Sequence, residues 1–431
     1  MLAMAVFGCS KDDNTTVIPD PVQESPSAGL QLAISKIDPI KGPEGTIINI
    51  SMENLVEIPD EYQVFFNELE ATTHGIENEI ILAQVPAKAN TGTVKVIIDG
   101  KTIIGPEFFY EPTTRISTLA GSSKGFIDGT GGQVWFNHPR SMAVGPQGNL
   151  YVADTENNRI RKITPEGKTT TFAGHTKGYV DGNVSIARFN YPNGVAVDEH
   201  GNVYVADSGN YRIRKISPEG EVTTLAGSTS GDTDGAAHNA KFGYPIGIAV
   251  NTLGEVYVSD SETNKIRKIS PTGYVSTFAG STEGHEDGTA TNAKFDYPYG
   301  IALDIVGNLY VADNESHKIR KITPDGIVST IAGGEEGFAD GNGDQAQFRS
   351  PSAVSADAEG NIYVADTENN KIRKISPDGE VNTPAGTTKG ARNGTAELAQ
   401  FNNPYGVLID PQNTIYVADS GNHRIRKITN E

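Results

Sequence analysis

Six aspartates at the ends of short apolar runs have the clearest potential for chemistry. They recur every 53 residues, each after Tyr-Val-Ala or, once, Tyr-Val-Ser, at Asp154, Asp207, Asp260, Asp313, Asp366 and Asp419. Such carboxylates could hold a metal ion or act as general acids and bases. A basic residue follows each one five positions later, at Arg159, Arg212, Lys265, Lys318, Lys371 and Arg424. Because a single site needs asymmetry, whereas these residues repeat, we expect structural hydrogen bonds and ion pairs.

A second acidic series consists of Asp-Gly pairs at the same spacing. The pairs are Asp128-Gly129, Asp181-Gly182, Asp234-Gly235, Asp287-Gly288 and Asp340-Gly341, with Asn393-Gly394 in the sixth position. Asp-Gly readily forms tight turns. One or two carboxylates also fall short of the roughly 6–8 oxygens that calcium prefers. The pairs therefore predict turns, and we assign no metal ligand and no cofactor to the chain.

Residues that differ between the repeats are better candidates for a binding site. They flank a repeated proline, as His138 and Arg140, Tyr191 and Asn193, Tyr244 and Ile246, Tyr297 and Tyr299, Ser350 and Ser352, and Asn403 and Tyr405. Tyrosine rings offer flat surfaces to sugar CH groups, and Asn, Arg and His bind hydroxyls. We predict a ligand, for example a glycan, at His138, Arg140, Tyr191, Tyr244, Tyr297, Tyr299 and Tyr405. The alternative is that the tyrosines only wedge between neighbouring repeats.

A repeated scaffold must carry these residues. Six copies of one unit begin at Phe136, Phe189, Phe242, Phe295, Phe348 and Phe401, and the proline follows three residues after each. In the second copy, the strand-like runs are 194–198, 203–207, 212–216 and 222–226, with turn residues between them. Four strands joined by tight turns make one blade of a β-propeller. Residues 114–431 therefore predict an all-β, six-bladed propeller, and an open solenoid is the alternative.

The ends of the repeat array favour a closed ring. The last copy stops just after its third strand, at 425–428, and the run 116–121 has the pattern of a fourth strand. That early strand would complete the last blade and remove two exposed sheet edges. We expect the long loop before each first strand and the turn after each second strand to emerge on the same face of the disc.

The repeat resembles the NHL family. The matching features are Pro-x-Gly before the first strand, Gly-Asn-Leu-Tyr-Val-Ala-Asp at 148–154, and Asn-x-Arg-Ile-Arg-Lys after it. Ser141 and Ala353 replace the glycine in two copies, which leaves the start of those strands open. Some NHL propellers bind RNA through a basic face, but a net charge of −19 disfavours nucleic acid here. Six-bladed propeller lactonases and lyases resemble one another in carrying metal ligands at the channel, whereas the inner strands here are mostly small and apolar.

Residues 34–112 predict a separate small β domain. The runs 46–50, 62–66, 80–85, 93–98 and 101–104 are strand-like, and Asp99-Gly100 is typical of a hairpin turn. Short strands over this length favour an immunoglobulin-like sandwich. The segment resembles an IPT/TIG domain in Ile37-Asp38-Pro39, Gly42-Pro43-Glu44-Gly45-Thr46 and Val64-Phe65-Phe66-Asn67. That resemblance implies a spacer or interaction module.

The N-terminal residues resemble the end of a bacterial lipoprotein signal peptide. A short apolar run and Gly8 precede Cys9, the single cysteine, and Ser10 to Asp13 form a polar acidic run of the Bacteroidetes surface type. The resemblance implies that Cys9 carries the lipid, that residues 1–9 are a signal remnant, and that 10–33 is a flexible tether. The basic residues that should open a signal peptide are missing, so we expect an earlier translation start.

The leading hypothesis is a non-catalytic outer-membrane lipoprotein, exposed on the cell surface, that binds an extracellular ligand such as a glycan through one face of the propeller. A protein–protein scaffold in an envelope complex is the second hypothesis, and a metal-dependent hydrolase or lyase is the third. The expected partners are a glycan or an envelope protein. We expect no nucleic acid, and contact with the membrane only through the lipid.

Overall fold

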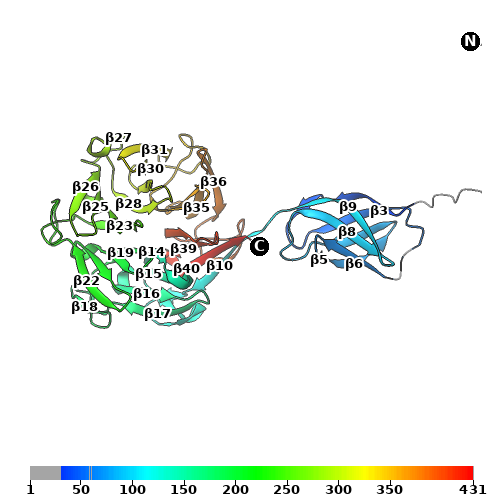
Figure 1. Ribbon diagram of the computed structural model, residues 1–431, viewed down its shortest axis with the longest axis horizontal. Helices are drawn as coiled ribbons and strands as arrows, with labels where there is room; N and C mark the ends of the chain where they lie inside the picture. Colours follow the sequence, from blue (N-terminus) through cyan, green and yellow to red (C-terminus); the bar gives the residue numbers. More distant parts are fainter. Residues whose placement is uncertain (1–30, 58, 60, 431) are drawn as a thin grey trace, which may run out of the picture. The chain divides into compact units, whose positions relative to one another are not determined.

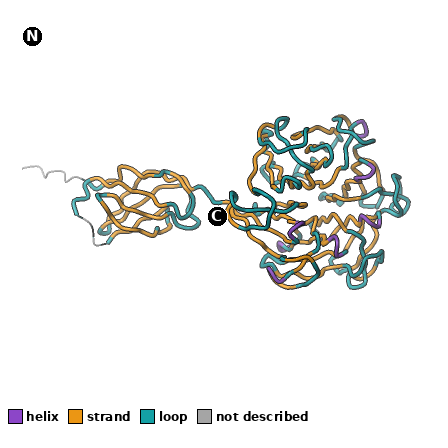
Figure 2. The backbone as a smooth tube through the Cα atoms, turned by 180° about the vertical axis from the view of Figure 1, so that it is seen from behind, coloured by secondary structure: helices purple, strands orange, loops and turns teal. Residues whose placement is uncertain are grey.

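The computed structural model describes residues 31–57, 59 and 61–430. Cys9 and nearly all of the predicted tether lie outside the described residues. Contacts divide the chain into one unit that ends at Glu111 and a second that begins at Pro112. Strands dominate both units, and the helices are short turns on the loops (Figures 1 and 2). None of the described helices is long and apolar enough to cross a bilayer.

The first unit is a sandwich of two sheets. One sheet has the order β1 (Ala33–Asp38), β3 (Ile47–Glu53), β7 (Ile80–Gln84) and β6 (Thr72–Glu77). The other has the order β2 (Lys41–Gly42), β9 (Lys101–Tyr110), β8 (Gly92–Ile98), β4 (Tyr62–Phe66) and β5 (Leu69–Glu70). Inward-facing residues such as Ile48, Val96 and Phe108 form its core. Asp99 and Gly100 both have positive φ, at 46° and 74°, and make the predicted hairpin turn between β8 and β9.

The second unit is a β-propeller in which each copy folds as one sheet. The strands of each sheet follow one another from the centre outward. The first sheet is β14 (Pro139–Val144), β15 (Leu150–Asp154), β16 (Arg159–Ile163), β17 (Lys168–Ala173) and β12 (Gly129–Thr130), and the second is β19 (Pro192–Val197), β20 (Val203–Asp207), β21 (Arg212–Ile216), β22 (Glu221–Ala226) and β18 (Gly182–Asn183). The third sheet is β23 (Pro245–Val250), β24 (Val256–Asp260), β25 (Lys265–Ile269) and β26 (Val275–Ala279), and the fourth is β28 (Pro298–Leu303), β29 (Leu309–Asp313), β30 (Lys318–Ile322), β31 (Ile327–Gly333) and β27 (Gly288–Thr289). The fifth sheet is β33 (Pro351–Ala356), β34 (Ile362–Asp366), β35 (Lys371–Ile375), β36 (Glu380–Ala385) and β32 (Gly341–Asn342), and the sixth is β38 (Pro404–Ile409), β39 (Ile415–Asp419), β40 (Arg424–Asn430), β10 (Thr114–Ala120) and β37 (Gly394–Thr395). The remaining elements are the pair β11 (Ser123–Lys124) and β13 (Trp135–Phe136), and the 3₁₀ turns η1 (Gly131–Gln133), η2 (Pro146–Gly148), η3 (Thr155–Asn157), η4 (Ser208–Asn210), η5 (Ser261–Thr263), η6 (Ala290–Asn292) and η7 (Ser420–Asn422).

The sheets form a closed ring. Each innermost strand contacts the next, and β38 contacts β14 in turn, so the sheets surround a common centre (Figure 1). The prediction that an early strand completes the last sheet is confirmed, because β10 pairs antiparallel with β40. The open solenoid is therefore wrong.

Small residues let the innermost strands approach each other. A Cβ on Gly194 would lie 2.1 Å from the carbonyl oxygen of Ile246 in the next sheet, and one on Gly247 would lie 2.3 Å from that of Tyr299. Ser141 and Ala353, which replace this glycine in two copies, are also small. Their strands, β14 and β33, begin at the repeated proline as the others do, so the substitutions leave the strand start unchanged.

A repeated hydrogen bond joins each sheet to its neighbour. The residue after each repeated aspartate donates from its side chain to the carbonyl oxygen of the next repeated proline, as Thr155 to Pro192, Ser208 to Pro245, Ser261 to Pro298, Asn314 to Pro351, Thr367 to Pro404, and Ser420 to Pro139. The last of these bonds connects the final copy to the first. The ring is thus closed by polar contacts at the centre as well as by β10.

Candidate functional site at the mouth of the ring

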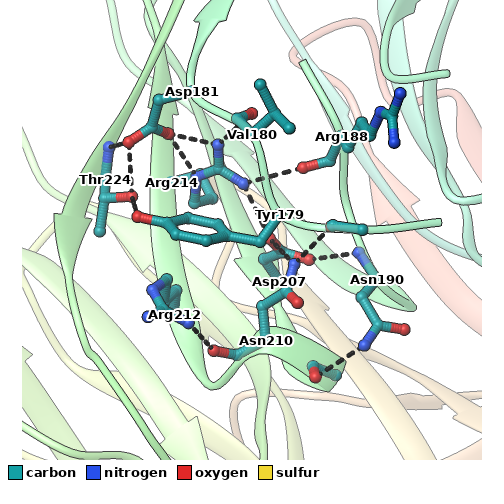
Figure 3. Close-up of polar contacts among 12 residues, drawn as sticks. Tyr179, Val180, Asp181, Arg188, Asn190, Asp207, Asn210, Arg212, Arg214 and Thr224 are labelled. Atoms are coloured by element: carbon teal, nitrogen blue, oxygen red, sulfur yellow. Dashed lines mark hydrogen bonds and ion pairs between the residues drawn. The ribbon is translucent and has the colours of Figure 1, made fainter. Parts of the chain in front are cut away.

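The repeated aspartates are buried parts of the scaffold. Asp207, at the end of β20, is fully buried and accepts hydrogen bonds from the Asn190 backbone N–H at 2.7 Å, Asn210 Nδ2 at 2.7 Å and Arg214 Nη1 at 2.9 Å (Figure 3). Arg214 is also fully buried and donates from Nε to Asp181 Oδ1 at 3.0 Å. Asp181 belongs to an Asp-Gly pair, for which the sequence predicts a turn. That prediction is wrong, because Gly182 lies in β18, which pairs with β22, and the Asp181 carboxylate holds the arginine instead.

The same arrangement recurs around the ring. The buried arginines are Arg161, Arg214, Arg267, Arg320, Arg373 and Arg426, and each is paired with the repeated aspartate of its own copy. The structural role predicted for the aspartates is confirmed, but their partner lies seven residues on rather than five. Arg159 faces Asp154 directly in the strand register, yet its guanidinium stacks over Phe126 at 3.8 Å. Arg161, two residues on and so on the same face of the strand, reaches the carboxylate diagonally.

Ionisation of this cluster has a consequence for binding. Burial raises the pKa of Asp207, Asp260 and Asp313 to about 6, and the neighbouring arginines oppose the rise. The carboxylates are therefore still charged at neutral pH. Each is matched by a buried arginine, so these repeated cations are not available to a ligand.

The loops before the first strands and the turns after the second strands lie on one face, as predicted. The residue before the repeated proline donates its backbone N–H to a side chain of the preceding copy, as Tyr191 to Asn158, Tyr297 to Asn264, Asn403 to Asn370, Ser350 to His317, and His138 to His423. The acceptors His317 and His423 thus occupy the repeat position that asparagine has in other copies. Tyr244 differs and donates to Asp260, because Tyr211 stands at the acceptor position of the preceding copy.

His423 and His138 form a neutral pair. Their rings are 4.7 Å apart and nearly perpendicular, at 88°. The backbone N–H of His138 donates to Nδ1 of His423 at 3.3 Å, which requires that nitrogen to be unprotonated. Burial lowers the pKa of His423 to about 4, and repulsion from a protonated His138 and from Lys124 lowers it further. Burial also lowers the pKa of His138.

A hollow of about 750 Å³ opens on this face. Four predicted site residues line it, namely His138, Arg140, Tyr299 and Tyr405. Below it, a channel of about 320 Å³ runs between the innermost strands. Arg140 and Tyr405 line both spaces, so they stand where the hollow meets the channel.

Arg140 and the two tyrosines make the polar centre of the hollow. Arg140 Nη1 donates to Asn193 Oδ1 at 2.9 Å, and its Cζ lies 4.7 Å from the centre of the Tyr405 ring. The Tyr299 and Tyr405 rings are 6.0 Å apart and inclined by 33°. Burial raises the pKa of both tyrosines, so their hydroxyls are protonated at neutral pH. The group offers flat rings, hydroxyls and one cation.

The other predicted tyrosines lie outside the lining of this hollow. Tyr191 packs against Lys177, whose Nζ is 4.8 Å from the ring centre. The Tyr244 hydroxyl is 3.4 Å from Nδ2 of Asn193. Tyr297 is 41% exposed. The contacts of these three tyrosines do not decide whether they bind a ligand or only wedge between neighbouring repeats, so both interpretations remain predictions for them.

The prediction missed several lining residues. Ser350, Ser352 and Asn403 are among the proline-flanking positions considered above but do not belong to the predicted ligand set. The other lining residues are Lys124, Asn314, Glu315, Thr367, Glu368, Lys389, Asn402, Ser420, Gly421 and His423. Lys124 and Lys389 stand twelve residues before a repeated phenylalanine, where the other copies carry Lys177, Ser230, Glu283 and Glu336, so the repeat alone does not single them out. In the described part of the chain, no group of three or more His, Cys, Asp or Glu is placed to hold a metal ion.

Comparison with known proteins supports the repeat. Residues 136–163, 189–216, 242–269, 348–375 and 401–428 match the NHL repeat. The fourth copy falls outside these matches, although its sheet has the same strand order. NHL repeat-containing protein 2 of Gallus gallus is 33% identical over 333 residues, which are 67% of this chain and 46% of that protein. The chloroplastic protein SUPPRESSOR OF QUENCHING 1 of Arabidopsis thaliana is 33% identical over 287 residues, 59% of this chain and 26% of that protein.

The chain thus spans less than half the length of these relatives. Among solved structures, an auxiliary nutrient binding protein from Bacteroides ovatus has a TM-score of 0.67 at 20% identity, covering 93% of this chain and 98% of that one. This likeness shows the fold. Together, the matches and the structure show NHL repeats folded as a β-propeller.

Proposed function

We propose that this protein is a non-catalytic, six-bladed NHL propeller that binds a glycan in the hollow at the mouth of the ring. The observation that carries the proposal is the group formed by Arg140, Tyr299 and Tyr405. These residues differ between copies of an otherwise regular repeat, and they meet at an open, polar hollow. Six sheets joined in a closed ring support the blade count.

The chemistry of the hollow suits a sugar. Tyrosine rings can pack against the apolar CH face of a pyranose, and the protonated hydroxyls, Asn402 and Asn403 can exchange hydrogen bonds with its hydroxyl groups.

We place this function on the bacterial cell surface. Two Bacteroides proteins of similar fold are named auxiliary nutrient binding proteins, which is consistent with capture of a ligand by this chain. Lipidation at Cys9 would anchor the chain in the outer membrane, and residues 10–33 would serve as the tether. The two-sheet first unit, as an immunoglobulin-like IPT/TIG module, would act as a spacer between the membrane and the propeller.

A glycan array tests the proposal. The full chain is screened against plant, host and microbial glycans, and the tightest ligand is then titrated against Tyr299→Ala and Tyr405→Ala. We expect each change to weaken binding about tenfold or more. Tyr274→Ala is the matched control, because Tyr274 is 57% exposed and follows the turn between β25 and β26, on the opposite face.

Three outcomes would contradict the proposal. Absence of binding to every glycan class would remove it and favour a scaffold, which a co-purifying envelope protein would support. Unchanged affinity in both hollow variants would move the ligand elsewhere on the chain. Stoichiometric metal with turnover in the same sample would instead support a hydrolase or lyase.

A further inference from the structure

We infer that the ligand of the hollow is an acidic saccharide, and that its carboxylate binds Arg140. This inference rests on the proposed function, because it specifies the charge of the glycan. It is carried by the bonding of Arg140 and by the distribution of charge around the hollow.

Arg140 has no ion-pair partner in the described part of the chain. It donates one hydrogen bond to a neutral amide, that of Asn193, and its guanidinium lies over the Tyr405 ring. The six repeated arginines contrast with it, since each is fully buried and paired with a carboxylate. A guanidinium held by a ring and an amide keeps donors free for a ligand, and a carboxylate matches two of them at once.

The charge around the hollow points the same way. Lys124 and Lys389 line it together with Arg140, and both lysines are exposed. Two carboxylates also line it, on Glu315 and Glu368, and Glu368 already lies 3.2 Å from Arg349. The hollow therefore carries a local excess of positive charge on a chain whose net charge is −19. Such a local field concentrates small anions, while the acidic remainder repels extended polyanions.

A carboxylate fits the hollow better than a sulfate. A uronic acid has one planar, singly charged group per ring, which suits one guanidinium, and it keeps a pyranose face for the tyrosines. A heavily sulfated chain would bring several charges close to Glu315 and Glu368 on the same rim. We therefore assign uronate residues to the hollow.

Calorimetric titration of the full chain tests this assignment. The probes are tetramers of galacturonate and of glucuronate, each as the free acid and as the full methyl ester, which keeps the sugar but removes the charge. We expect at least one acid to bind tenfold or more tighter than its ester. Arg140→Gln should bind acid and ester equally well, with an unchanged thermal unfolding midpoint.

The control is Lys177→Gln. Lys177 lies on the same face, beside Tyr191, but does not line the hollow, so its loss should leave the affinity for the acid unchanged. A double variant, Lys124→Gln with Lys389→Gln, tests the charge of the hollow while Arg140 stays intact. Both lysine side chains are exposed, so the fold should not change. The double variant should weaken binding of the acid about threefold at low salt and leave binding of the ester unchanged.

The possible failures are distinguishable. Equal binding of acid and ester, or an equal loss in Lys177→Gln and Arg140→Gln, would overturn the inference and leave glycan binding in place. Tighter binding of a sulfated tetramer than of any uronate would overturn the assignment of the carboxylate. Absence of binding to any saccharide, charged or neutral, would instead remove the proposed function.

Discussion

Replacing Arg214 by methionine should destabilise the propeller strongly, because it leaves a buried carboxylate without its cation. In the folded chain Arg214 binds Asp207 and Asp181 and donates to the carbonyl oxygens of Val180 at 2.9 Å and Arg188 at 3.1 Å (Figure 3). Methionine fills much of the same volume and bonds to none of these groups. The change therefore isolates the polar role of the side chain.

The cost falls mainly on the two carboxylates, because the carbonyl oxygens of Val180 and Arg188 each keep a backbone N–H partner. Asp207 keeps its bonds from Asn190 and Asn210 but remains fully buried, and breaking a buried pair in this way costs about 3–5 kcal/mol. The Asp181 side chain is 39% exposed, so water replaces its partner and its loss adds at most about 1 kcal/mol. Adding Asp207→Asn removes the stranded charge and should recover part of the loss.

Urea unfolding measures this cost. The single tryptophan, Trp135, lies in the propeller, so its fluorescence follows the second unit by itself. Arg212→Met is the matched control. Arg212 stacks over Tyr179 and donates to the Asn210 carbonyl oxygen, and it pairs with no carboxylate among the described residues, so its loss should cost about 1 kcal/mol. Equal, small losses for Arg212→Met and Arg214→Met would refute the reasoning.

Three further predictions follow from the ring and its mouth. Gly247→Ala should lower the free energy of unfolding in urea by about 1–3 kcal/mol, because its Cβ would lie 2.3 Å from the Tyr299 carbonyl oxygen. Gly132→Ala, which has open space around it, should leave the stability unchanged. Similar losses for the two variants would contradict the close approach of the innermost strands. A chain that starts at residue 122 lacks β10 and exposes the edge of β40, so light scattering should show that it aggregates. A chain that starts at residue 112 keeps β10 and should stay monodisperse. Equal behaviour of the two chains would contradict closure of the ring by β10. The His423 imidazole should titrate in NMR near pH 4 rather than at its ordinary 6.5. Its neutral form therefore contributes folding stability that is present above pH 6.5 and is lost as the pH falls through 4. A midpoint near 6.5 would contradict the hydrogen bond from His138.

The repeat made most of the second unit predictable. A period of 53 residues aligned every strand, and the missing fourth strand of the last copy indicated the role of β10. The periodicity also showed that the repeated aspartates are structural. It could not identify their partner, because Arg159 and Arg161 lie on the same face of β16 and only the packing decides which one turns inward.

The site was predictable only in part. Arg140 and Tyr405 follow the repeated proline and lie at the mouth of the channel. Tyr191 and Tyr297 precede it, and the left-handed backbone there, with φ of 50° at both, is held by an asparagine of the preceding copy. His138, Ser350 and Asn403 have the same backbone conformation and do line the hollow, so the position before the proline does not by itself decide which side chains reach it. The repeat aligns His423 with Asn158, Asn264 and Asn370, but only the structure shows that residues at this position accept a backbone N–H from the next copy.

The most direct test of the central claim is a crystal structure of the full chain with the tightest-binding saccharide from the array. The account predicts a sugar ring packed against Tyr299 or Tyr405, with a polar group of the ligand on Arg140. A saccharide bound on the opposite face of the propeller, on the first unit, or at the rim without contact to these three side chains would contradict it.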